Sequence, residues 1–169
     1  STLLASSAAS DVYKRQLLYM PWEDRDSLLV TREEFENDMM KSYETLRKAS
    51  IEYNDAPVYI PPYEYYNKEI SAWAKNMGIQ VINYTPGTMS NADYTTPDMG
   101  QKYRSSKFIY DKIMEMEKKE GLNGHLMLIH FGTDDRRTDK FYNGYLDKMI
   151  KTLKRKGYTF VPVREAVGI

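Results

Sequence analysis

The stretch HLMLIH at residues 125–130 is a short apolar run, and the polar segment FGTDDRR at residues 131–137 follows it directly. A run of this length that ends in a polar loop is typical of a buried β-strand. Apolar residues recur at helical spacing on both sides, at residues 105–120 and at residues 138–156. Parallel strands need a covering element between them, so a strand flanked by two helices predicts an α/β fold with parallel strands.

The same alternation continues toward the N-terminus and the C-terminus. The sequence predicts further helices and strands at residues 31–48, 57–60, 67–78, 79–84 and 158–163. The first helix is expected to begin with a capping box, because Glu34 follows Thr31 by three residues. The predicted order is αβαβαβαβ, with right-handed crossovers between the strands.

The composition excludes several classes of function. The 169 residues include 24 Lys plus Arg and 24 Asp plus Glu, so no net charge attracts the chain to nucleic acid or to an anionic membrane surface. Cysteine is absent, which excludes disulfides and thiolate metal sites. No apolar run approaches the roughly 20 residues of a transmembrane helix. Phosphate-binding glycine loops, GxSxG elbows and HExxH motifs are also absent, so we expect no nucleotide, serine-hydrolase or zincin site.

Residues 1–16 (STLLASSAASDVYKRQ) differ from the rest of the chain. They are rich in Ser and Ala and lack the pattern of a secretory signal peptide. The piece DVYKRQ resembles translated adaptor sequence. We expect residues 1–16 to be a non-native or disordered leader and residues 17–169 to form the domain.

Candidate catalytic residues follow the predicted strands, where ligands of parallel α/β sheets bind. His130 ends the run at residues 125–130, and an imidazole can act as acid or base near neutral pH. Asp93, in the long loop at residues 85–104, can orient such an imidazole. Simpler alternatives are a histidine bonded to a loop carbonyl and an aspartate in an Asx turn. His125 is expected to be structural.

The segment PPYEYYN at residues 61–67 places two prolines before three tyrosines. A rigid backbone can direct the N–H of Tyr63 toward an oxyanion, and tyrosine rings can stack on sugars. The alternative is a proline turn whose tyrosines cover the edge of the core. We expect Tyr63, Asp93 and His130 to surround one shared hollow.

A metal site within this chain alone is not expected. His125 and His130 are five residues apart, which points them to opposite faces of a strand. The segment TDDRRTD at residues 133–139 is acidic, but Arg136 and Arg137 favour local ion pairs over a bound cation.

Three motifs together resemble a polysaccharide deacetylase, the NodB-homology domain of carbohydrate esterase family four. They are PVYIPPYEYYN at residues 57–67, the pair Asp93–Tyr94, and LMLIHFG at residues 126–132. The resemblance covers residues 17–169 and implies a distorted (β/α) barrel. It also implies hydrolysis of acetyl groups on a polysaccharide or amino sugar, with a zinc-like divalent metal held by one Asp and two His.

The resemblance also implies roles for individual residues. It assigns substrate binding to Pro62, Tyr63, Leu128 and Tyr94. The backbone N–H of Tyr63 would bind the oxyanion and Leu128 would line the acetyl pocket. His130 would protonate the departing amine, while the carboxylate of Asp93 tunes that histidine.

The sequence departs from the family at several positions. Ile60, Glu64 and Tyr94 stand where the family has Arg, Gly and Trp, and its Asp-Asp and HxxxH metal motifs have no match. We therefore expect a barrel truncated at the N-terminus that holds no metal, is inactive alone and self-associates through an open sheet edge. The resemblance implies that the parent protein is exported or bound to the cell envelope. The alternative is a non-catalytic carbohydrate-binding domain of the same fold.

Overall fold

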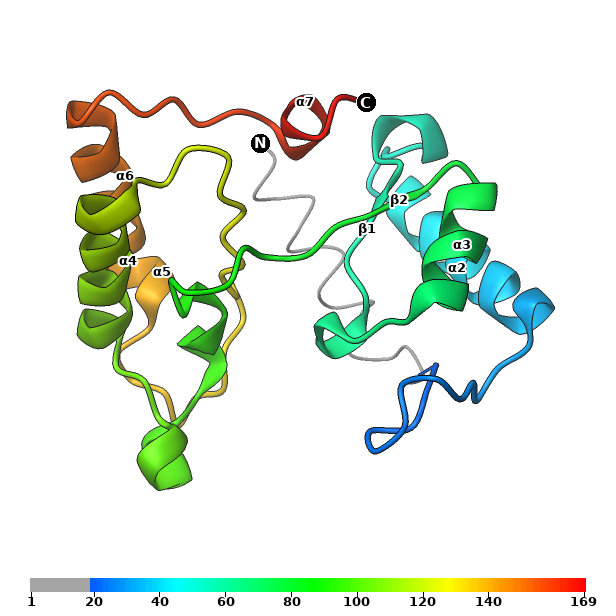
Figure 1. Ribbon diagram of the computed structural model, residues 1–169, viewed down its shortest axis with the longest axis horizontal. Coiled ribbons are helices and arrows are strands. Elements are labelled where there is room, and N and C mark those ends of the chain that lie inside the picture. Colours follow the sequence, from blue (N-terminus) through cyan, green and yellow to red (C-terminus); the bar gives the residue numbers. More distant parts are fainter. Residues whose placement is uncertain (1–18) are drawn as a thin grey trace. The chain divides into compact units, whose positions relative to one another are not determined.

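The computed structural model describes residues 19–169, so the leader expected at residues 1–16 lies outside the described residues. The chain divides into two compact units (Figure 1). Of the described residues, the first unit contains residues 19–83 together with Pro162–Ile169, and the second unit is Tyr84–Val161.

In the first unit, helix α2 (Arg32–Arg47) begins where the sequence predicts it. The side chain of Thr31 accepts a hydrogen bond from the N–H of Glu34 at 3.2 Å, and the Glu34 carboxylate accepts one from the N–H of Thr31 at 2.7 Å. The predicted capping box is therefore confirmed. The buried face of the helix carries Phe35, Met39 and Tyr43.

Helix α3 (Lys68–Asn76) is also predicted correctly. The side chain of Asn67 caps it by accepting a hydrogen bond from the N–H of Ile70 at 2.9 Å. The rings of Phe35 and Trp73 lie 5.8 Å apart, which joins α3 to α2. These two helices and the segments beside them share an aromatic-rich core around Tyr19, Phe35, Tyr59, Tyr65, Ile70 and Ile79.

The sheet of the first unit consists of two short parallel strands, β1 (Val58–Tyr59) and β2 (Gln80–Val81). Both lie inside the predicted ranges, and Pro61 ends the first range as expected. Short 3₁₀ helices occur at Tyr53–Asp55 and Pro62–Glu64, and helix α7 (Val163–Ala166) lies close to the C-terminus.

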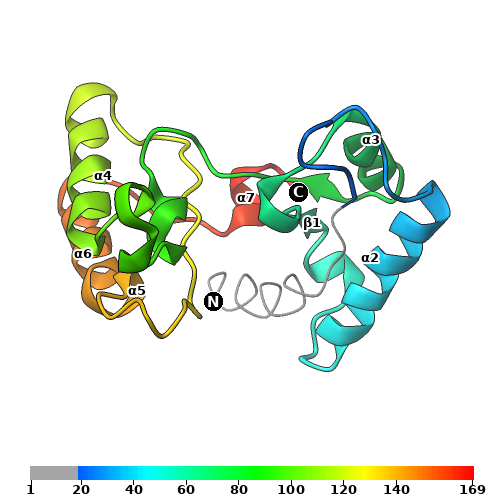
Figure 2. The same ribbon diagram turned by 90° about the horizontal axis from the view of Figure 1, so that it is seen from below.

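The second unit is built from helices α4 (Ser106–Glu120), α5 (Phe141–Gly144) and α6 (Leu146–Arg155). Helices α4 and α6 lie side by side in Figures 1 and 2. The unit's core contains Ile109, Ile113, Leu122, Phe141, Leu146, Met149 and Leu153. The loop at residues 85–104 holds two 3₁₀ helices, Ser90–Tyr94 and Pro97–Lys102.

Two predicted strands are wrong. Residues 125–130 are half-buried and form no strand. Their backbone accepts a hydrogen bond where the N–H of Thr85 donates to the carbonyl of Leu126 at 2.8 Å, and the N–H of His125 donates to the carbonyl of Leu122 at 3.1 Å. Residues 158–163 also form no strand, and Phe160 and Val161 are exposed. A strand needs a row of lateral partners, which neither segment has among the described residues.

The predicted helix at residues 138–156 is interrupted and begins late. Asp139 is held by the start of α4, since its carboxylate accepts a hydrogen bond from the N–H of Ser106 at 2.7 Å. Residues 138–140 are therefore not helical, and Tyr145 (φ −123°, ψ −21°) separates α5 from α6.

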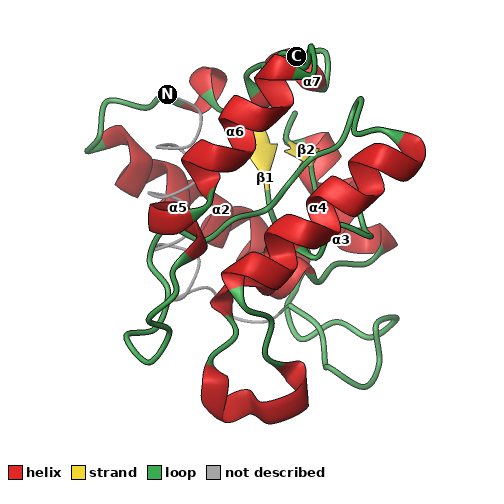
Figure 3. Cartoon of the chain, turned by 90° about the vertical axis from the view of Figure 1, so that its left-hand side faces the viewer, coloured by secondary structure: helices red, strands yellow, loops and turns green. Residues whose placement is uncertain are grey.

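The structure is thus a mixed helix and sheet fold with one two-stranded parallel sheet in the described residues (Figure 3). The barrel implied by the resemblance stays a prediction. None of the described helices is both long enough and apolar enough to cross a membrane.

Candidate functional site

Asp93 and His130 lie together in the second unit. The carboxylate of Asp93 accepts a hydrogen bond from the backbone N–H of His130 at 2.7 Å, and its other oxygen lies 2.6 Å from the ring Nδ1. The side chain of Asp93 is 1% exposed and that of His130 is 28% exposed. One partner is therefore buried, and the other reaches the surface.

The contact between Nδ1 of His130 and the carboxylate of Asp93 indicates which ring nitrogen carries a proton. An ionised carboxylate only accepts hydrogen bonds, so Nδ1 of His130 carries a proton and donates it to Asp93. Proton exchange with another molecule then falls to Nε2. An Asp–His pair of this kind can present a histidine as an acid or a base.

Asp93 is presented by the 3₁₀ helix Ser90–Tyr94. Met89 precedes this helix in the left-handed region at φ 55°, and its carbonyl accepts a hydrogen bond from the N–H of Ala92 at 3.0 Å. Thr95 ends the helix by donating its side-chain hydroxyl to the carbonyl of Ala92 at 2.7 Å. Asp93 thus lies in a turn that is fixed at both ends.

Two further predicted residues belong to the same unit. Tyr94 is 50% exposed, and its ring meets the imidazole of His130 edge to face at a centroid distance of 5.8 Å. Leu128 is half-buried, two residues before His130. His125 is also half-buried, and its Nδ1 lies 3.5 Å from the carbonyl oxygen of Asn123.

Pro62 and Tyr63 belong to the first unit. Pro62 is buried, whereas the side chain of Tyr63 is 64% exposed. Tyr63 and Glu64 both have φ 56°, which is unusual for two consecutive residues that are not glycine. Tyr63 therefore belongs to a different unit from the Asp93–His130 pair, and the hollow expected to be shared by the three residues stays a prediction.

The acidic segment at residues 133–139 forms the local ion pairs that the sequence predicts. Arg136 lies 2.8 Å from Asp134 and 2.7 Å from Asp98. The side-chain hydrogen bonds that Arg136 donates to Asp134, together with the one from its backbone N–H, keep the pKa of Asp134 well below its usual range.

The described residues do not fit the divalent metal that the resemblance implies. No group of three or more His, Asp or Glu side chains among residues 19–169 could hold a metal ion. Asp93 also directs its carboxylate to His130 rather than to an open position. We therefore derive no catalytic step through a metal.

The sequence pattern predicts only local ion pairs for Arg137 and gives no sign that it is buried. Arg137 is fully buried beside the turn that carries Asp93, whereas its neighbour Arg136 is exposed. Two adjacent arginines in an acidic loop look equivalent in a sequence, so no local signal distinguishes them.

Comparisons with known proteins find a similarity in fold to a solved structure, but no match in sequence. No protein-family model matches the chain, and no curated protein matches it. Among solved structures, the chain is similar to the Bc1960 peptidoglycan N-acetylglucosamine deacetylase, crystallised with 4-naphthalen-1-yl-N-oxidanyl-benzamide. The likeness has a TM-score of 0.60 at 17% sequence identity, and it covers 94% of this chain but 66% of that one. The chain therefore has a deacetylase-like fold and spans slightly less than two thirds of that structure.

Proposed function

We propose that this chain is part of a carbohydrate deacetylase that removes acetyl groups from a polysaccharide or an amino sugar. The hydrogen-bonded Asp93–His130 pair is the observation that carries the proposal, because it prepares one imidazole for proton transfer. The fold likeness to a peptidoglycan N-acetylglucosamine deacetylase supports the same class of substrate.

In this proposal His130 is the general acid. Protonated Nε2 donates its proton to the amine nitrogen as the bond between that nitrogen and the acetyl carbon breaks, and the electron pair of the bond stays on nitrogen. The carboxylate of Asp93 stabilises the imidazolium before the transfer and fixes the orientation of the ring. Tyr94, beside the imidazole, would contact the sugar. The departing amine leaves neutral.

The remaining parts of the reaction are assigned by resemblance. We propose that the N–H of Tyr63 binds the oxyanion, with Pro62 holding the turn and Leu128 lining the acetyl pocket. A zinc-like cation would be bound by residues that this sequence lacks, so the chain alone should not turn over substrate.

The first test is a titration of the full chain, with its histidines labelled by ¹⁵N, with the trisaccharide of N-acetylglucosamine. We expect the ring signals of His130 to shift and those of His125 to stay unchanged. The variant His130→Gln should weaken binding, and His125→Gln serves as the matched control in the same segment. A trisaccharide that shifts neither ring at millimolar concentration, or both rings equally, would contradict the proposal.

A second candidate is a non-catalytic carbohydrate-binding domain, and one observation in the first unit favours it. Trp22 and Tyr63 are 59% and 64% exposed, and their rings lie 5.2 Å apart. Exposed aromatic rings of this kind can stack on a sugar. Binding that survives a chelator and His130→Ala but is lost in Tyr63→Ala would select this candidate over the deacetylase.

A further inference from the structure

Arg137 is buried beside the candidate site without being part of its surface. Its side chain is 0% exposed and is the largest of the fully buried side chains in the described residues. Removing a guanidinium from water costs several kcal/mol unless acceptors surround it. The hydrogen bonds and the ion pair of Arg137 therefore show which parts of the second unit its buried guanidinium holds together.

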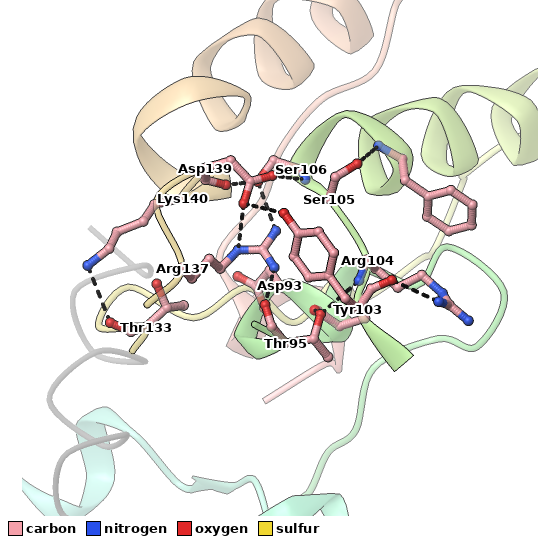
Figure 4. Close-up of polar contacts among 12 residues, drawn as sticks. Asp93, Thr95, Tyr103, Arg104, Ser105, Ser106, Thr133, Arg137, Asp139 and Lys140 are labelled. Carbon is pink, nitrogen blue, oxygen red and sulfur yellow. Dashed lines mark hydrogen bonds and ion pairs between the residues drawn. The ribbon is translucent and has the colours of Figure 1, made fainter. Parts of the chain in front are cut away.

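The guanidinium of Arg137 joins three segments of the second unit (Figure 4). One amino group donates to the backbone carbonyl of Thr95, and the other donates to the hydroxyl of Ser106 at 2.9 Å. Nε lies 3.7 Å from the carboxylate of Asp139, which is an ion-pair contact, and it has no hydrogen-bond partner among the described residues. The two hydrogen bonds leave from two separate nitrogens of the guanidinium, and the single nitrogen of a lysine cannot occupy both positions.

The contact with Thr95 leads directly to Asp93. Thr95 closes the 3₁₀ helix Ser90–Tyr94 through two hydrogen bonds to the carbonyl of Ala92, from its hydroxyl at 2.7 Å and from its N–H at 3.1 Å. The hydroxyl of Thr95 also accepts a hydrogen bond from the N–H of Arg104 at 3.0 Å. Arg137 binds the remaining polar group of this residue, its carbonyl, and so completes the attachment of the turn.

Asp139 fixes the opposite side of the guanidinium. Its two carboxylate oxygens accept hydrogen bonds from the hydroxyl of Tyr103 at 2.8 Å and from the N–H of Ser106 at 2.7 Å. Arg137 is thereby attached to the start of α4, which belongs to the core of the unit. The turn with Asp93 is thus connected to a rigid element through one side chain.

We propose that Arg137 is a positioning residue for the Asp93–His130 pair: it holds the carbonyl of Thr95 and thereby keeps the Asp93 carboxylate against Nδ1 of His130. A fully buried guanidinium does not touch substrate, so Arg137 acts through Asp93. This inference rests on the proposed function, in which that pair carries the chemistry.

The test compares Arg137→Lys with Arg136→Lys, which alters the exposed neighbour. The readout is the Nδ1–H proton of His130 in the ¹H NMR spectrum of the full chain, with His125 as the internal reference. We expect this proton to be broadened away by exchange with water in Arg137→Lys and to be retained in Arg136→Lys. A folded Arg137→Lys protein with an unchanged Nδ1–H signal would overturn the inference.

If Arg137→Lys does not fold, the variant Ser106→Ala tests the same inference. Ser106→Ala removes one acceptor of the guanidinium and keeps the others, so Nδ1–H of His130 should exchange severalfold faster while remaining visible. An unchanged exchange rate in folded Ser106→Ala overturns the inference. The readout needs no sugar, so a protein that passes this test and fails to bind the trisaccharide counts against the proposed function alone.

Discussion

Asp93 and His130 meet at two points, because separate carboxylate oxygens of Asp93 receive the backbone N–H and the ring Nδ1–H of the same residue. The backbone contact attaches the end of the segment at residues 125–130 to the turn that carries Asp93. The ring contact fixes which nitrogen bears the proton. A single buried carboxylate thus sets both the place and the chemical state of the imidazole.

Replacing Asp93 by Asn tests this double contact. An amide keeps the shape but offers one acceptor, so one donor of His130 loses its partner. We expect the second unit to be destabilised by about 1.5–3 kcal/mol, as for a lost hydrogen bond to a charged group. Amide hydrogen exchange in helix α4 measures this.

Asp98→Asn is the matched control for that variant. Asp98 is exposed and pairs with Arg136, and such surface pairs contribute little to stability because water screens them. Equal destabilisation by the two variants would show that the hydrogen bonds of Asp93 stabilise the second unit no more than a surface ion pair does.

Addition of Zn²⁺ should leave the chain unchanged. The described residues contain no group of three metal ligands, so we expect no rise in Tm and no release of acetate from acetylated chitin oligomers. Thermal unfolding with and without a chelator measures the first effect, and an acetate assay measures the second. A Tm increase that disappears in His130→Gln would contradict this expectation.

The buried tyrosines of the first unit should make it sensitive to alkaline pH. Burial, with a smaller contribution from Tyr53, raises the pKa of Tyr43 to about 12. The unfolded chain loses this proton near pH 10, so the stabilisation is complete below pH 10 and is lost as pH rises toward 12. Burial also raises the pKa of Tyr19 and Tyr59 in the same direction.

Tyr43→Phe should therefore make the alkaline loss of stability shallower. The change between pH 10 and 12 is at most about 1.4 kcal/mol per pH unit for one tyrosine. At neutral pH the variant should cost about 1 kcal/mol, because the hydroxyl of Tyr43 donates to the carbonyl of Ala56 at 2.8 Å. Urea unfolding at several pH values checks both effects, and an unchanged alkaline slope would refute the assignment to Tyr43.

Glu64→Gly should stabilise the turn at residues 62–64. Glu64 has φ 56°, where a side chain is unfavourable by roughly 1–2 kcal/mol and glycine is not. Glu64→Ala removes the carboxylate but keeps Cβ, so it is the control that isolates the backbone effect. We expect the glycine variant to unfold at a higher temperature than the alanine variant, and the reverse order would contradict the argument.

Local signals in the sequence predict the helices well. Thr31, Asn67 and Ser105 each cap a helix through a side chain that accepts a hydrogen bond from an N–H three residues later. Such caps involve neighbouring residues only, so they can be recognised without knowledge of the fold.

Features that depend on distant partners are predicted less well. The run at residues 125–130 has the composition of a strand but has no adjacent strand to pair with among the described residues. Asp139 lies outside the helix predicted for it because its carboxylate binds the N–H of Ser106, 33 residues earlier. In the candidate site, chemistry alone suggests that Asp93 approaches His130. The burial of Arg137 depends on partners that are distant in the sequence, Thr95 and Ser106, so no local pattern predicts it. The catalytic and positioning roles of these residues stay predictions.

The unit boundaries have a consequence for inheritance. Asp93, His130 and Arg137, together with the hydrogen-bonding partners described for them, all lie within Tyr84–Val161. One continuous segment of the polypeptide therefore contains the entire arrangement. Recombination that moved the DNA for this segment would move all of these residues together.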